Sequence, residues 1–296
     1  MENWVKAGKI AAESREYAAS LIKPNISLLE ISEKVEKFIK DKGAEEGFPS
    51  PQLSINNIAA HYIAFPNDKT IIQKGDVVKV DIGIHFEGCV GDNATTVEAG
   101  TNKFSKLIEA THKARDNAIK EVKEGIQVCK IGEAIEETAK SYGFKVITNL
   151  SGHNLKPYII HGGITIPNYN NGDKTKLKNN EVIAIEPFLI ENGSGLIKEG
   201  KSSSIYRLDS NRIPRDIFQR QLIQYIITKY QTLPFSTRQL AKVFPLSRLQ
   251  IALALLKRQR IISEYAQLPE QSGAIVAQAE NTIIVKQDHA EITTKI

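Results

Sequence analysis

Two aspartates in neighbouring apolar segments are the first residues of this sequence that suggest chemistry. Asp81 lies within 77–85 and Asp92 within 89–97, two segments rich in β-branched residues that Phe86-Glu87-Gly88 connects. The pattern predicts a β-hairpin in which Asp81 comes within a residue or two of lying opposite Asp92. Buried carboxylates that face each other repel, so we expect a divalent metal between them. A solvated hairpin face is the alternative.

Three later residues strengthen the metal hypothesis. Glu186 and Glu280 each interrupt an apolar run, and His153 follows a glycine that leaves room beside it. A buried glutamate is rarely tolerated unless it is paired or bound to a metal. Each residue also has an ordinary explanation, since Glu186 can cap or form a salt bridge and a lone histidine is more often structural. Together, four carboxylates and one imidazole predict a two-metal site that supports hydrolysis.

Seven motifs follow one another along the chain, five of them around these residues: Val80-Asp81-Ile82-Gly83, Gly91-Asp92-Asn93-Ala94, Gly152-His153-Asn154-Leu155, Ile185-Glu186-Pro187-Phe188 and Ala279-Glu280-Asn281-Thr282, together with the stretch 54–62 and Ile160-His161-Gly162-Gly163. In type, order and spacing they resemble the motifs of methionine aminopeptidases. That family has the pita-bread fold, which creatinase and proline dipeptidases share. The resemblance covers essentially the whole chain, and it implies an α+β fold.

The resemblance also implies a metal-binding role for each of five residues. Asp81 would chelate one metal, His153 and Glu186 would bind the other, and Asp92 and Glu280 would bridge both. Glu186 would in addition handle the proton of the hydroxide that attacks the first peptide carbonyl. Two divalent ions per chain are therefore expected, and carboxylate and imidazole ligands admit Co, Mn, Fe or Zn.

Substrate contacts are implied for residues outside the ligand set. His61 and His161 would hydrogen-bond the scissile amide region and the tetrahedral intermediate, as donors aimed at developing charge do. Phe48, Ile160 and Tyr265 match positions that line the methionine pocket.

The residues on either side of Glu280 depart from the family pattern. Ala279 and Asn281 stand where type 2 relatives have Phe and His, so the ligand is kept while its surroundings change. A large insertion between Glu186 and Glu280 resembles type 2 enzymes, and the start of the chain resembles that of the archaeal ones.

A scaffold of helices and strands must position these residues. Hydrophobic periodicity and helix-stop residues predict the helices, whereas short apolar runs predict the strands. We expect helices over 3–22, 27–42, 104–122 and 130–142, an irregular stretch over 48–66, a turn over 178–181, and strands around 151–155, 159–163, 181–189 and 273–285.

A basic block lies between two of the expected strands. Residues 201–260 contain twelve lysines and arginines against two aspartates, a surplus of +10, which leaves −5 for the rest of a chain of net charge +5. Such asymmetry suggests an inserted module with its own partner.

The pattern of the basic block resembles a winged helix. We expect a helix over 213–230, a second capped by Ser236, a third over 248–260 capped by Ser247, and a strand at 261–262. The expected division is a pita-bread catalytic domain of residues 1–193 and 268–296, with an inserted winged-helix-like helical subdomain at 194–267.

Composition indicates a globular, intracellular protein. The 296 residues are 41% hydrophobic and 25% charged, with two cysteines, no apolar run long enough to span a bilayer, and no signal-peptide core at the start. We expect a cytoplasmic monomer without membrane contact.

The function implied by the resemblance is removal of the initiator methionine from nascent polypeptides whose second residue is small. A proline dipeptidase, which shares the five ligands, is one alternative. A non-catalytic ribosome- or nucleic-acid-binding protein of the same fold is another. The basic insertion suggests a ribosome contact rather than a reader of one DNA sequence.

Overall fold

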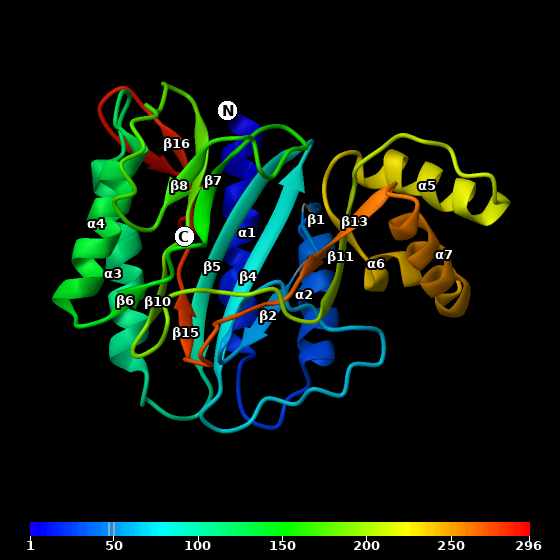
Figure 1. Ribbon diagram of the computed structural model, residues 1–296, viewed down its shortest axis with the longest axis horizontal. Coiled ribbons are helices and arrows are strands. Elements are labelled where there is room, and N and C mark those ends of the chain that lie inside the picture. Colours follow the sequence, from blue (N-terminus) through cyan, green and yellow to red (C-terminus); the bar gives the residue numbers. More distant parts are fainter. Residues whose placement is uncertain (47, 50) are drawn as a thin grey trace.

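Two helix pairs frame the molecule in a computed structural model, which describes residues 1–46, 48–49 and 51–296. The pairs lie about one hundred positions apart in the sequence: α1 (Glu2–Ser20) with α2 (Leu28–Asp41), and α3 (Ser105–Glu121) with α4 (Val128–Ser141). Helices α2 and α4 have 14 residues each, and α1 is slightly longer than α3, with 19 residues against 17. They agree with the four helices that periodicity predicts. The first pair packs on one side of the central hairpin, and the second covers the strands on the other side (Figure 1).

The central hairpin forms as predicted from strands β4 (Val77–Phe86) and β5 (Cys89–Glu98). Glu87 and Gly88 connect the strands, with φ angles of 49° and 82°. Positive φ at both central residues is typical of a type I′ turn, which matches the twist of the strands. Strand β4 also pairs with β1 (Glu45–Glu46) and β2 (Gln52–Ile55).

Two further sheets are formed by strands outside the basic segment. One has the order β17-β16-β9-β7-β8 and the other β15-β10-β6. Their bounds are β6 (Lys145–Val146), β7 (Ser151–Leu155), β8 (Thr165–Pro167), β9 (Val182–Ile185), β10 (Phe188–Ile190), β15 (Val276–Gln278), β16 (Asn281–Val285) and β17 (Ala290–Ile292).

Two strands that the sequence predicts as continuous are broken, and both predictions were wrong in the same way. The run 181–189 divides into β9 and β10 at Glu186-Pro187, where proline has no N–H to donate to a sheet. The run 273–285 divides into β15 and β16 at Ala279-Glu280. In both cases the chain leaves one sheet and enters the other, so each predicted ligand glutamate lies at a crossing point.

Two other predictions of secondary structure need correction. The stretch 48–66 is not irregular throughout, because it contains β2 and β3 (Ile58–Ala60); Ser50 lies outside the described residues. Strand β3 pairs with β14 (Leu268–Pro269), far away in the sequence. Conversely, 159–163 is not a strand: Ile159 makes an isolated bridge with Lys156. The predicted turn at 178–181 is present.

The basic segment forms a lobe at one end of the molecule (Figure 1). It consists of the sheet β12-β11-β13 and helices α5, α6 and α7. The bounds are β11 (Ser202–Leu208), α5 (Ile217–Tyr230), β12 (Phe235–Ser236), α6 (Thr237–Ala241), α7 (Leu246–Arg258) and β13 (Ile262–Ala266). One hydrophobic cluster, drawn from residues 206–262, holds the helices against the sheet.

The starts of the lobe helices agree only in part with the prediction. Ser236 caps α6 through a capping box with Gln239, as expected. Helix α5 begins later than predicted because Pro214 disfavours helix before it, and Asp216 supplies the N-cap. Ser247 is not a cap, because α7 begins at Leu246.

No helix in the described part of the chain is both long enough and apolar enough to cross a membrane.

Candidate metal centre

Asp81 and Asp92 reach the same space from adjacent strands. In the β4–β5 register Asp92 pairs with Gly83, so Asp81 is two residues from the position opposite Asp92. This is the spacing the sequence predicts. A Cβ on Gly83 would lie 2.9 Å from the Phe48 Cβ and 3.3 Å from Asp92 Oδ1. Glycine therefore makes room for the Asp92 carboxylate across the strand.

Glu280 is held against Asp92 by hydrogen bonds between two sheets. The Glu280 N–H donates to the Ala94 carbonyl at 2.9 Å, and the Asp92 N–H donates to Thr282 Oγ1 at 2.8 Å. The Thr282 hydroxyl in turn donates to the Asp92 carbonyl at 2.7 Å. Because these contacts join β5 to the β15–β16 crossing, the backbone fixes both carboxylates relative to each other.

His153 approaches the carboxylates from β7. A Cβ on Gly152 would lie 2.2 Å from the Ala184 carbonyl oxygen, so only glycine lets β7 lie this close to β9. His153 Nε2 is 3.8 Å from Asp92 Oδ2 and 3.6 Å from Glu186 Oε1.

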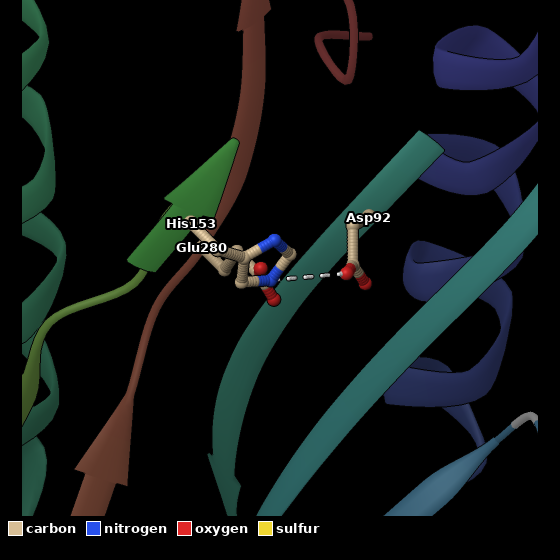
Figure 2. A group of neighbouring side chains, drawn as sticks. All are labelled: Asp92, His153 and Glu280. Atoms are coloured by element: carbon tan, nitrogen blue, oxygen red, sulfur yellow. Dashed lines mark ion pairs between the residues drawn. The ribbon is translucent and has the colours of Figure 1, made fainter. Parts of the chain in front are cut away.

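Asp92, His153 and Glu280 converge on one point between the strands (Figure 2). One ligand atom from each of the three lies within 4.8 Å of the other two.

The predicted site residues surround a small cavity of about 50 Å³. Gln52 and Ala60 also line it, together with these predicted residues: Phe48, His61, Asp81, Asp92, His153, Ile160, His161, Glu186 and Glu280. A second cavity of about 300 Å³ shares His61, His153, His161 and Glu186 with it. The site therefore has an inner chamber at the carboxylates and an outer one.

Tyr265 is the predicted pocket residue that lies behind the lining of the inner chamber. Its ring centroid is 6.0 Å from that of Phe48 and 5.4 Å from that of His61, both edge-on. It therefore supports two lining residues and does not itself line the chamber, as far as the described residues show.

Burial shifts every carboxyl group of the site toward the protonated form. It raises the pKa of Asp81 to about 7. The pKa of Asp92 is raised well above its ordinary value, first by burial and then by the charge of Asp81. Burial likewise raises the pKa of Glu186 and of Glu280, and the neighbouring carboxylates add to the effect. Four ionised carboxylates are therefore unstable together here unless a cation joins them.

The histidines of the site are shifted toward the neutral form. Burial lowers the pKa of His153 to about 3 and that of His61 to about 4. It also lowers the pKa of His161, with a further contribution from the charge of Arg207. A neutral imidazole is the form that binds a metal.

The site suits a divalent cation by its chemistry. Asp81 Oδ1 is buried and accepts no hydrogen bond of ordinary geometry from the described residues, although the nearby Gln278 side chain acts to lower the pKa of Asp81. Carboxylate oxygens with one imidazole nitrogen are a donor set for the borderline divalent metals. An orphaned oxygen among mutually repelling carboxylates is the arrangement that such a cation would stabilise.

Sequence reasoning missed two residues that hold the site together. Gln52 donates from Nε2 to Asp81 Oδ2 at 3.2 Å, and the Ala266 carbonyl lies 3.1 Å from His61 Nδ1. Neither a neutral amide nor a backbone carbonyl leaves a signal in the sequence. Gln52 would have been found from the pairing of β2 with β4, which places it directly opposite Asp81.

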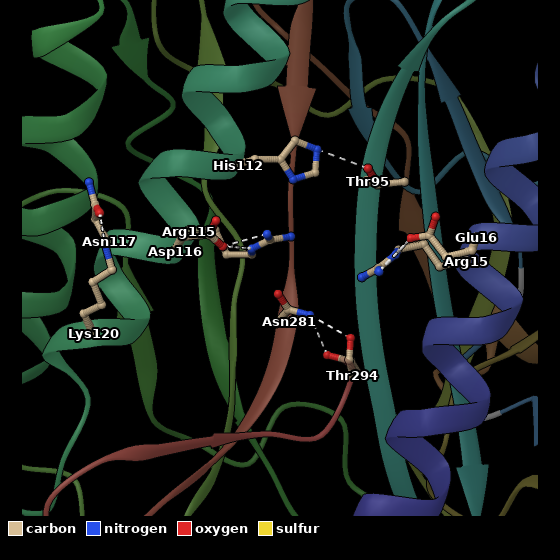
Figure 3. A network of polar contacts seen from close by, with 10 residues as sticks. All are labelled: Arg15, Glu16, Thr95, His112, Arg115, Asp116, Asn117, Lys120, Asn281 and Thr294. Atoms are coloured by element: carbon tan, nitrogen blue, oxygen red, sulfur yellow. Dashed lines mark hydrogen bonds and ion pairs between the residues drawn. The ribbon is translucent and has the colours of Figure 1, made fainter. Parts of the chain in front are cut away.

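The unusual neighbour of Glu280 anchors the end of the chain. Asn281 Nδ2 donates to the carbonyl and hydroxyl oxygens of Thr294, at 3.1 and 2.8 Å (Figure 3). Arg15, His112 and Arg115 lie in the same region between α1 and α3 (Figure 3). Asn281 thus ties β16 to the last residues of the chain, while Ala279 is fully buried.

Comparison with known proteins agrees with this geometry. Residues 2–220 match the model of metallopeptidase family M24. A methionine aminopeptidase of Thermococcus onnurineus is 42% identical over 294 residues, which cover 99% of each chain. The chain belongs to the archaeal-type methionine aminopeptidases of family M24. The resemblance seen in the sequence is confirmed, and membership of a metallopeptidase family implies metal ions.

Solved structures show the fold of this M24 chain. A methionine aminopeptidase from Thermotoga maritima aligns with a TM-score of 0.71 at 22% identity, covering 100% of this chain and 96% of the other. A thermophilic Arx1 aligns with a TM-score of 0.84 at 17% identity, covering 99% and 90%. The mixed α+β, pita-bread prediction is confirmed.

Proposed function

We propose that this protein removes the initiator methionine from nascent polypeptides whose second residue is small. The observation that carries the proposal is the convergence of Asp81, Asp92, His153, Glu186 and Glu280 on one buried chamber, in a chain similar from end to end to methionine aminopeptidases. A cytoplasmic site of action follows from this substrate, since nascent chains emerge there.

The five candidate ligands would hold two divalent ions between them. Asp81 would bind one ion, His153 and Glu186 the other, and Asp92 and Glu280 both. When bound, Co, Mn, Fe or Zn ions supply Lewis acidity and an activated water for hydrolysis. Glu186 lines both the inner and the outer chamber, where its carboxylate would take up the proton of the attacking water and return it.

The two remaining histidines would act on the peptide. Both face the inner and outer chambers, and their lowered pKa values keep the rings neutral. If the His61 Nδ1–H donates to the Ala266 carbonyl, Nε2 is left as an acceptor for the scissile amide N–H. His161 would donate to the oxygen of the tetrahedral intermediate.

Apolar residues beside the ligands give the proposed side-chain selectivity. Phe48 and Ile160 line the inner chamber, and Tyr265 packs edge-on against Phe48. These residues would hold the methionine side chain. The next residue of the substrate would face the crowded ligands, so that bulky or charged side chains are excluded by size and desolvation.

Peptide hydrolysis with controlled metal content tests the proposal. Metal-stripped protein, reloaded separately with Co²⁺, Mn²⁺, Fe²⁺ or Zn²⁺, should release methionine from Met-Ala-Ser and leave the dipeptide Ala-Pro intact. Asp92→Ala should abolish this activity, whereas Asp288→Ala, at an exposed position, should retain it.

The other outcomes decide between the alternatives. Preferential cleavage of Ala-Pro would identify a proline dipeptidase. Failure to cleave either peptide at full metal occupancy would favour the non-catalytic hypothesis. An active Asp92→Ala variant would refute the ligand assignment.

We propose further that residues 194–267 are an inserted winged-helix-like subdomain, and that 1–193 with 268–296 form the catalytic domain. The separate hydrophobic cluster of the lobe and its sheet β12-β11-β13 support this division. The surplus of positive charge in residues 201–260 would give weak, salt-sensitive contact with a polyanion such as ribosomal RNA. We expect the protein to act as a monomer.

A further inference from the structure

Gln52 connects a proposed metal ligand to a proposed substrate-binding residue. Its side chain is buried, and its residue pairs directly with Asp81 across β2 and β4. Gln52 Nε2 donates to Asp81 Oδ2 at 3.2 Å, and Gln52 Oε1 accepts from the His61 backbone N–H at 3.1 Å. One carboxamide thus bridges two functional residues that are twenty positions apart in the sequence.

The chemistry of the two partners fixes the orientation of this amide. A carboxylate only accepts hydrogen bonds and a backbone N–H only donates them. Turning the amide over would set its NH₂ group against the His61 N–H and its oxygen against the Asp81 carboxylate. Glutamine in this one orientation satisfies both contacts, and no apolar side chain of similar size satisfies either.

His61 needs such support because its backbone is strained. Its φ angle of 67° lies in the left-handed region, which costs a residue other than glycine about 1 kcal/mol or more. The N–H bond to Gln52 holds the backbone in this conformation. The contact between Nδ1 and the Ala266 carbonyl, at 3.1 Å, holds the ring.

The hydrogen bond from Gln52 also fixes the orientation of the Asp81 carboxylate. Gln52 donates to Oδ2, whereas Oδ1 is buried without a hydrogen bond of ordinary geometry among the described residues and has the Gln278 side chain nearby. The carboxylate is thus oriented with one oxygen engaged by the protein and the other available to a cation. Partners of this kind usually contribute 10- to 100-fold to metal affinity or activity.

We propose that Gln52 is a positioning residue that couples the orientation of the Asp81 carboxylate to the placement of His61. The inference rests on the proposed aminopeptidase function for its His61 arm, and on metal binding alone for its Asp81 arm. It differs from a packing role because it makes two separable demands, a donor toward Asp81 and an acceptor toward His61.

Gln52→Met tests the proposal with little change of volume. Titration calorimetry of metal-free protein with Mn²⁺ should show affinity about 10-fold weaker than in the wild type. With Met-Ala-Ser at saturating Mn²⁺, kcat should fall about 10- to 100-fold while KM changes less, because a misplaced His61 acts on the chemical step. Unchanged Mn²⁺ affinity together with unchanged kcat would overturn the proposal.

A double-mutant comparison separates positioning from general damage. In a His61→Ala background Gln52→Met should cost little further kcat, because the residue it positions is gone. His161 makes no hydrogen bond to Gln52 among the described contacts, unlike His61. In a His161→Ala background the two falls in kcat should therefore multiply. Equal multiplication in both backgrounds would show that Gln52 does not act through His61.

Gln52→Glu keeps the two contacts apart if the Met variant fails to fold. It retains an acceptor for the His61 N–H and replaces the donor toward Asp81 by an oxygen. It should therefore weaken Mn²⁺ binding by a larger factor than it lowers kcat at saturating Mn²⁺, both relative to the wild type. A larger fall in kcat than in Mn²⁺ affinity would overturn the proposal. If the wild type binds Mn²⁺ and cleaves no peptide, the proposed function fails, while the calorimetry still tests the contact with Asp81.

Discussion

Replacing Glu270 by glutamine should destabilise the protein markedly at neutral pH. Glu270 is fully buried and lies between β14 and β15, where the chain returns from the lobe. Oε1 accepts from the N–H and hydroxyl of Ser194 and the N–H of Gly195, and Oε2 from the N–H and hydroxyl of Ser272 and the N–H of Ala274. One carboxylate thus connects the chain segments that precede and follow the lobe.

Two estimates give the same contribution of the Glu270 carboxylate to the free energy of unfolding. Burial by itself would raise the pKa of Glu270, but the Ser194 and Ser272 donors outweigh it and hold the pKa at about 2, below the ordinary value of 4.5. That difference corresponds to about 3 kcal/mol. In Glu270→Gln, an NH₂ group would face three donors, and three lost hydrogen bonds also amount to about 3 kcal/mol.

The pH dependence follows from the sign of the shift. A lowered carboxyl pKa stabilises the folded state above pH 4.5, and the stabilisation is lost as the pH falls toward 2. Urea unfolding of metal-free wild type and Glu270→Gln should therefore differ by about 3 kcal/mol at pH 7 and by clearly less at pH 3. A fall in Tm of roughly 5–10 °C at pH 7 is expected.

A matched variant shows whether the effect belongs to this site. Glu291 is a partly exposed carboxylate of β17 that pairs with Lys286, so Glu291→Gln removes the same charge at little cost. If Glu270→Gln were no less stable than Glu291→Gln at pH 7, the hydrogen bonds to Glu270 would contribute nothing net. A difference that stayed constant down to pH 3 would show that the pKa is not lowered.

The remaining predictions concern the site and the lobe. His61→Ala and His161→Ala should each lower kcat about 100-fold and leave the metal content, measured by elemental analysis, unchanged; stoichiometric loss of metal would make that histidine a ligand. Gly152→Ala should lower the free energy of unfolding by about 1–3 kcal/mol and weaken metal binding, because its Cβ would lie 2.2 Å from the Ala184 oxygen; an unchanged urea midpoint would contradict the close approach of the two strands. Metal binding at pH 7 should release protons, because burial raises the carboxyl pKa values. The calorimetric enthalpy of binding should therefore vary with the ionisation enthalpy of the buffer, and the metal affinity should fall from pH 8 to pH 6. A binding enthalpy that is independent of the buffer would argue against protonated ligands. The lobe should bind unrelated RNA and DNA weakly and lose them at raised salt; tight, salt-resistant binding to one DNA sequence would refute this.

The four candidate carboxylate ligands could be selected from the sequence because each leaves a local signal. Asp81, Asp92, Glu186 and Glu280 each put a charge into an apolar run, which is costly in a fold unless the charge has a purpose. The hairpin was predictable for a similar reason, because a two-residue turn fixes the register of the strands on either side. The helix pairs follow from periodicity and from their stop residues, Pro24, Gly43, Gly125 and Gly143.

Other features depend on contacts that no segment encodes by itself. Apolar runs indicate that 181–189 and 273–285 are buried, but they do not tell which sheet each half joins. Strand β3 exists because Leu268, two hundred residues later, pairs with Ala60. Gln52 is likewise unremarkable until its strand is placed beside β4. Long-range pairing therefore separates what the sequence predicts from what only the structure shows.

The crossing points explain why the two candidate ligand glutamates lie where strands break. A residue inside a regular strand points its side chain to one face of one sheet, and its backbone is committed to that sheet. Glu186 and Glu280 lie where the chain passes between two sheets, so their side chains can enter the space enclosed by both. The backbone that crosses there is held by neighbours: Pro187 ends one strand, and the Glu280 N–H bonds to Ala94 of the hairpin. This arrangement buries the carboxylates close to one another. Because buried, ionised carboxylates repel each other, a cation would stabilise the site.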